Sequence, residues 1–132
     1  MRHALLIVLG LVIGIIGTVM AMNALNSGPS WPKNLMAMQG FHMRSLNTNI
    51  KQNHCAVTDN LPHLQTLRAL SNDIEPIFLP VENEQDFRKK ASDLRASIDA
   101  VIAVPPADCA AVSAATTRIG RECKGCHDEF RH

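Results

Sequence analysis

The stretch that decides the fold is Asp108–Arg131, DCAAVSAATTRIGRECKGCHDEFR. Apolar residues recur along it three, four or seven positions apart: Val112, Ala115, Ile119, Cys126 and Phe130. This spacing places them on one face of an α-helix. We therefore expect a long amphipathic helix that starts near Asp108 and buries that face against other parts of the chain.

Two earlier stretches have the same periodicity. The first, Trp31–Gln52, has Ser30 as its N-cap. Its apolar stripe consists of Met36, Met43, Leu46 and Ile50. The second, Val57–Ile74, is ended by prolines at positions 76 and 80, and Pro62 suits its first turn better than its interior. Both stretches are predicted to be amphipathic helices.

A third such stretch starts near Asn83 and is stopped by the Pro105-Pro106 pair. Glu84 and Asp86 suit the positive end of its helix dipole. Its apolar stripe consists of Phe87, Ala91, Leu94, Ile98, Val101 and Ile102. The alternating pattern that marks β-strands is missing from the sequence. The prediction is an all-α fold, an up-down-up-down four-helix bundle with short connections.

The N-terminal residues do not belong to this bundle. Ala4–Met22 is an uninterrupted apolar run without a charged residue, and Arg2 precedes it. Such a run is either a secretory signal or a membrane-spanning helix, and both send the following chain across a membrane. We expect residues 1–25 to form this hydrophobic helix, residues 26–30 to be a linker, and residues 31–132 to be the folded domain.

The folded domain is close to electrically neutral. The chain has 13 basic and 12 acidic residues, and one of the basic residues is Arg2, outside the domain. Without an excess of positive charge, binding to nucleic acid is not expected. A domain of about 100 residues has a small hydrophobic core, so a covalent cross-link would add to its stability.

The chemistry is concentrated in the pentapeptide Cys123-Lys124-Gly125-Cys126-His127. Two cysteines three apart on a helix can each bond one vinyl group of a haem, and the next histidine can bind the iron. This is the attachment pattern of c-type haem, and it needs the export that the N-terminal run provides. A zinc site using His54, Cys55 or Cys109 lacks the usual paired spacing. A redox dithiol lacks a βαβ context.

The segment Ile119–Arg131, IGRECKGCHDEFR, resembles the C-terminal helix of the class II c-type cytochromes, the cytochrome c prime family and its low-spin relatives. The resemblance covers the folded domain and is most specific at this motif. It implies one haem c attached through Cys123 and Cys126, with His127 as the proximal iron ligand. It also implies that Arg131 lies beside the proximal imidazole. The alternative is that the Arg131 side chain is only a solvent-exposed charge in the last helical turn, where the helix dipole favours a positive charge.

Met36 is the expected sixth ligand of the iron. In an up-down bundle the first helix starts at the end where the last one finishes, so Met36, about 7.5 Å into its helix, is level with His127. Met43 lies deeper, and Met38 falls on the solvent side. The low-spin members that this chain resembles carry methionine at this position, where high-spin members carry leucine or phenylalanine. The alternative is that Met36 only packs in the core.

These assignments predict a one-electron carrier with a low-spin haem held by His127 and Met36, since a thioether ligand favours ferrous iron. No pattern in the sequence offers acid–base chemistry on a substrate, so the chain is not expected to be an enzyme. The alternative is a five-coordinate cytochrome that binds nitric oxide or carbon monoxide, if Met36 does not ligate.

The expected partners are redox proteins of a respiratory chain, and the resemblance adds a homodimer formed through the first two helices. The expected location is the periplasm. If the N-terminal segment is not cleaved, it anchors the protein in the inner membrane. Its apolar run exceeds the usual length of a signal core, which favours the anchor.

Cys55 and Cys109 remain after haem attachment. They fall in the first and third connections of the bundle, which lie at the same end, opposite the haem. In an oxidising compartment we expect a disulfide between them. They are 54 residues apart in sequence, so the bridge is worth about 4 kcal/mol in the chain-entropy model. The alternative is two unpaired buried thiols.

Overall fold

The computed structural model describes residues 2–26 and 30–131, and the chain divides into two units, Met1–Ser30 and Trp31–His132. The first unit contains helix α1, Arg2–Asn26. The elements of the second are α2 (Trp31–Lys51), α3 (Val57–Leu70), the 3-10 turn η1 (Ser71–Asp73), α4 (Ile74–Phe78), α5 (Glu84–Ala103) and α6 (Cys109–Phe130). The described residues contain no strand, so the chain is all-α.

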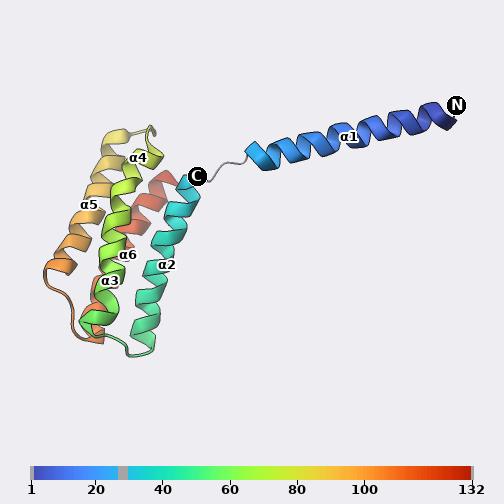
Figure 1. Ribbon diagram of the computed structural model, residues 1–132. Helices are drawn as coiled ribbons and strands as arrows, with labels where there is room; N and C mark the ends of the chain where they lie inside the picture. The colour runs from blue at the N-terminus through green and yellow to red at the C-terminus, as the bar shows by residue number, and fades with distance from the viewer. Residues whose placement is uncertain (1, 27–29, 132) are drawn as a thin grey trace. The chain divides into compact units, whose positions relative to one another are not determined.

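The four long helices of the second unit form an up-down-up-down bundle (Figure 1). Each packs mainly against two neighbours: α2 and α5 both lie against α3 and α6. The predicted fold class is confirmed. The start of α2, the end of α6 and the short helix α4 lie at one end (Figure 1), which we call the motif end because Cys123–His127 lies in the last turns of α6.

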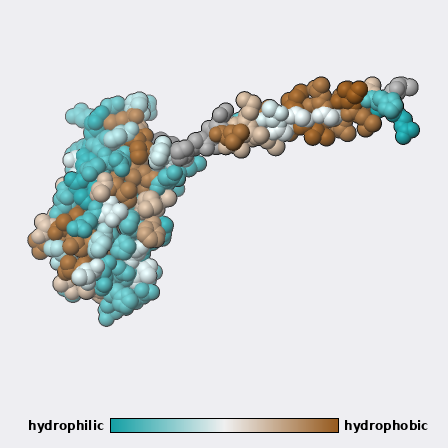
Figure 2. Space-filling view, in the orientation of Figure 1, coloured by the Kyte–Doolittle hydropathy of each residue, from teal (hydrophilic) through white to brown (hydrophobic). Residues whose placement is uncertain are grey.

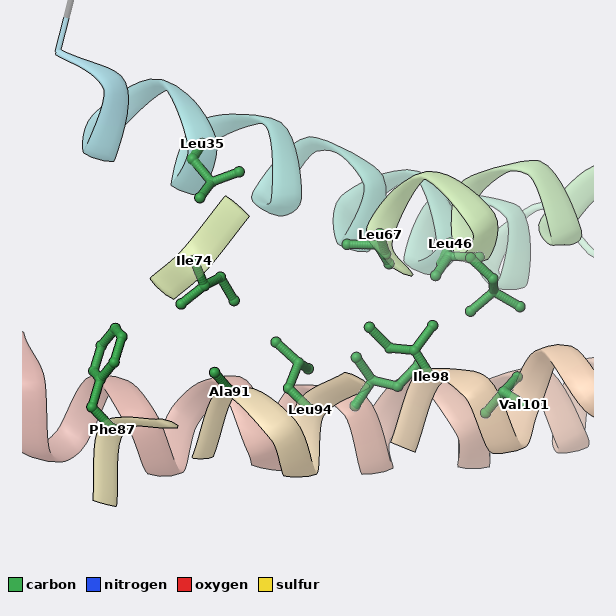
Figure 3. Packing of buried hydrophobic residues seen from close by; sticks show 11 residues of the cluster. Leu35, Leu46, Leu67, Ile74, Phe87, Ala91, Leu94, Ile98 and Val101 are labelled. Carbon is green, nitrogen blue, oxygen red and sulfur yellow. The ribbon is translucent and has the colours of Figure 1, made fainter. Parts of the chain in front are cut away.

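The core runs along the whole bundle. Figure 3 shows Leu46 and Leu67 opposite Leu94 and Ile98, and Leu35 and Ile74 above Phe87 and Ala91. The stripe predicted for α5 is buried at five of its six positions, and only Ile102 is partly exposed. This burial of apolar surface is the main force that holds the bundle together, because isolated helices of this length are marginal in water.

The second predicted helix differs in the structure. It begins at Val57, the predicted start, so Pro62 lies inside α3 rather than in its first turn. The carboxylate of Asp59 in the first turn accepts a hydrogen bond from the backbone N–H of Ala56 (3.2 Å), and this bond caps the start of the helix. The helix also ends at Leu70, and the chain continues through η1 into the separate helix α4.

The end opposite the motif is held by a disulfide between Cys55 and Cys109, whose Cα atoms are 5.1 Å apart. Buried Asn60 donates hydrogen bonds to the carbonyl oxygens of His54 (3.2 Å) and Ala56 (3.1 Å) on either side of Cys55. The bridge thus joins the α2–α3 connection to the start of α6.

Helix α1 is apolar and by length and composition can cross a membrane over Arg2–Leu25. Figure 2 shows apolar residues along much of the helix, with polar ones at its N-terminal start. A secretory signal has the same character, so the helix is compatible with both predicted roles.

Candidate functional site

Two free thiols lie on α6 at the motif end. Cys123 and Cys126 are both partly buried and pack against the core, and neither is in a disulfide. Burial raises the pKa of both thiols, so they are neutral rather than thiolate at pH 7. Between them, a methyl group added at Gly125 would meet no atom within 4 Å. The surface of α6 at Gly125 is therefore open, on a side of the helix that differs from the side carrying the two sulfurs.

The last turn of α6, which carries His127, is fixed to α5 by two contacts. The ring of Phe130 meets that of Phe87 edge-on, with centroids 5.1 Å apart, and Phe87 is buried. Glu129 forms an ion pair with Lys90 of α5 at 3.1 Å. These contacts set how α6 is turned about its axis at the motif end, and so which side His127 faces.

The register between α2 and α6 is set by a close approach of Met43 to Gly120. A methyl group added at Gly120 would lie 3.8 Å from Cε of Met43. The two helices run antiparallel, and seven residues toward the motif end lead to Met36 on α2 and His127 on α6. Seven residues are about two turns, or roughly 10.5 Å, on each helix. This register predicts that Met36 and His127 lie at a similar level on the neighbouring helices α2 and α6.

The neighbouring candidates on α2 face elsewhere. Met38 is 47% exposed, on the solvent side where the sequence places it. His42 faces α3, where its Nδ1 lies 2.9 Å from Nδ1 of His63. Burial, with the nearby His63, lowers the pKa of His42. Arg131 caps the end of α6: its backbone N–H donates to the carbonyl oxygen of His127 (3.2 Å), and the residue is exposed.

The structure offers little for the zinc alternative. Two of its ligand candidates, Cys55 and Cys109, are bonded to each other at the end opposite the motif. Residues 2–26 and 30–131 hold no group of three or more histidines, cysteines or carboxylates that could bind a metal ion.

Gln39 is the residue of this region that sequence reasoning did not single out. Its side chain is only 7% exposed, and its Nε2 has no hydrogen-bond partner within the described residues. The signal was present in the sequence, because Gln39 interrupts the apolar stripe of α2 with a polar side chain. The two free thiols of α6, three residues apart and followed directly by His127, fit the covalent attachment of a haem.

Comparison with known proteins gives a family match for the folded domain. Residues 32–131 match the family described as Cytochrome C'. A 50-residue segment is 46% identical to cytochrome c-556 of Agrobacterium tumefaciens (strain II Chrys), covering 38% of this chain and 41% of that protein. The corresponding match to cytochrome c-556 of Agrobacterium fabrum is 42% identical and covers 38% and 34%. The chain thus spans about two fifths or less of these curated relatives.

A solved structure shows the same fold. Cytochrome c' from Rubrivivax gelatinosus superposes with a TM-score of 0.65 at 19% sequence identity, covering 76% of this chain and 91% of that one. At this identity the likeness concerns the bundle and not the residues of the site.

Proposed function

The chain belongs to the Cytochrome C' family, and from this premise we propose that it is a periplasmic one-electron carrier. The cofactor of this family is covalently bound haem c. The sulfurs of Cys123 and Cys126 would hold it by thioether bonds, with His127 as the proximal ligand and Met36 as the sixth. The two free thiols, three residues apart on α6 and followed directly by His127, support this attachment.

The observation that carries the proposal is the register between α2 and α6. The contact of Met43 with Gly120 supports a similar level for Met36 and His127 on the neighbouring helices α2 and α6. Two protein ligands leave no open position on the iron for a substrate or a gas, so the proposed role is electron transfer. When bound, the haem supplies the one-electron couple of its iron.

The chain's own residues would bias that couple toward the reduced state. The Met36 thioether is a soft ligand that favours ferrous iron. Arg131 is proposed to lie beside His127, where a positive charge disfavours the additional positive charge of ferric iron. The apolar core beneath, with buried Leu35 and Phe87, keeps water away from the inner side of the site.

Absorption spectroscopy of the oxidised and reduced protein tests this proposal. We expect a low-spin spectrum with the weak near-infrared band of a sulfur–iron bond in the oxidised form. Met36→Leu should abolish that band and create an open position that binds carbon monoxide. Met38→Leu is the matched control on the same helix and should change neither property, because Met38 is exposed.

A wild-type protein with a high-spin spectrum and ready carbon monoxide binding would contradict the carrier. The same result would establish the other reading, a five-coordinate cytochrome that binds nitric oxide or carbon monoxide.

A further inference from the structure

Gln39 holds a buried amide in the first half of α2. Its Nε2 has no hydrogen-bond partner within the described residues, and its side chain is 7% exposed. A buried donor without a partner costs about 1–3 kcal/mol, and such groups are normally paired in a native protein. The partner is therefore to be sought among the groups that surround this amide in the haem-loaded protein.

The direction of the Gln39 side chain follows from its neighbours on α2. His42 contacts His63 of α3, and Met43 approaches Gly120 of α6. Around the helix, Gln39 lies between these two, about 60° from His42 and about 40° from Met43. Its side chain therefore points into the bundle interior, between α3 and α6, and not toward solvent.

Along the axis of α2, the Gln39 amide lies close to the level of Met36, the proposed sixth ligand. Met36 lies three residues before Gln39, about 4.5 Å nearer the motif end. Side chains on an α-helix lean toward its N-terminus, which for α2 is the motif end. The Gln39 side chain thus leans over the turn that carries Met36.

We propose that Gln39 is a positioning residue for the sixth ligand: when Met36 turns toward the iron in the haem-loaded protein, the Nε2 amide of Gln39 donates a hydrogen bond to Sδ of Met36. The inference rests on the proposed ligation of the iron by Met36. A thioether sulfur accepts such a bond weakly, and the bond fixes the orientation of the sulfur. It also draws electron density from the sulfur, which makes it a poorer donor to ferric iron and favours the reduced protein.

The experiment compares wild type with Gln39→Leu and Gln39→Met, which keep the size of the side chain and remove the N–H donor. Redox titration should show a lower midpoint potential. At a fixed solution potential the ratio of reduced to oxidised protein should fall about three- to tenfold. This change corresponds to the free energy of one neutral hydrogen bond. The near-infrared sulfur–iron band should shift or broaden but persist.

Ser97→Ala is the matched control. The Ser97 hydroxyl is also buried without a hydrogen-bond partner in the described part of the chain. It lies on α5 ten residues beyond Phe87, toward the end opposite the motif. Removing it should leave both the potential and the sulfur–iron band unchanged.

Three outcomes separate the hypotheses. If the wild type has the sulfur–iron band and both Gln39 variants keep its potential and band shape, the role of Gln39 is wrong while Met36 ligation stands. If the wild type lacks the band, Met36 ligation fails and the role of Gln39 fails with it. If neither variant folds, NMR of the reduced wild type decides: the Gln39 side-chain amide must resist hydrogen exchange and lie near the Met36 methyl group, or the inference is refuted.

Discussion

Met36 and Met38 are chemically identical side chains with different surroundings. Met36 is partly buried and packs against the core, whereas Met38 is 47% exposed. Two residues along an α-helix turn the side chain by about 200°, so the pair cannot share a face. At the scale of the residue, position on the helix rather than residue type decides which methionine is available as a ligand.

The two thiols of α6 can be tested one at a time. Cys123→Ala and Cys126→Ala should each retain haem through the remaining thioether. One vinyl group then stays unsaturated and conjugated with the porphyrin ring. The absorption maximum of the ferrous haem, measured after the protein is denatured in pyridine, should therefore move to a longer wavelength. Cys55→Ser is the control and should leave the maximum in place. An unmoved maximum in both α6 variants would exclude thioether attachment at these cysteines.

At the scale of the element, the short helix α4 is held to α5 by one ion pair. Arg95 donates from Nη2 to the Glu75 carboxylate (2.9 Å) and from Nη1 to the carbonyl oxygen of Ser71 (3.3 Å). Both charged side chains are mostly buried, 21% and 18% exposed. The pair therefore fixes η1 and α4 where they close the motif end of the core.

This ion pair makes the free energy of unfolding depend on pH in the acid range. The hydrogen bond from Arg95 lowers the pKa of Glu75 in the folded protein. A carboxyl whose folded pKa lies below its unfolded value, about 4.3, stabilises the fold above that pH. Its contribution is lost as the pH falls through the folded pKa.

We expect Glu75→Gln to lower the free energy of unfolding at pH 7 by about 1–2 kcal/mol. The variant should then lose less stability than wild type between pH 5 and the acid limit. Urea unfolding at several pH values measures both effects. Asp99→Asn, in the more exposed pair with Arg68, should cost less than about 1 kcal/mol. Equal pH profiles for wild type and Glu75→Gln would count against the assignment.

At the scale of the whole molecule, the Cys55–Cys109 bridge lies at the end of the bundle opposite the haem motif. Cys55→Ser, Cys109→Ser and the double variant should each lose about 4 kcal/mol of unfolding free energy in the chain-entropy model, with unchanged haem content. Denaturant unfolding with and without reductant measures this. Alkylation of two thiols in the unreduced, denatured protein would show that the bridge is absent.

Cleavage or retention of α1 decides whether the protein is soluble in the periplasm or anchored in the membrane. We predict that the helix stays attached as an anchor, because the apolar run is longer than a usual signal core and α1 is long enough to span a bilayer. Cell fractionation with N-terminal sequencing should then recover an uncleaved protein with the inner membrane. Soluble periplasmic protein that starts at Met22 would identify the segment as a signal.

The sequence by itself determined the helical fold and the chemistry at the end of α6. The apolar period of 3.6 depends only on local geometry, so the stripe of α5 was predicted residue by residue, and Cys123-Lys124-Gly125-Cys126-His127 is contiguous in the chain. The break between α3 and α4 was missed, because it depends on how η1 packs and on the Glu75–Arg95 pair.

Only the tertiary structure decided which side chains from different helices meet. Bundle topology predicted a similar level for Met36 and His127, which lie 91 residues apart, but the contact of Met43 with Gly120 between α2 and α6 comes from the structure alone. The burial of Gln39 without a partner likewise results from α3 and α6 closing over α2. Local periodicity says which face of a helix is buried, whereas the register between helices depends on the packing of all four at once.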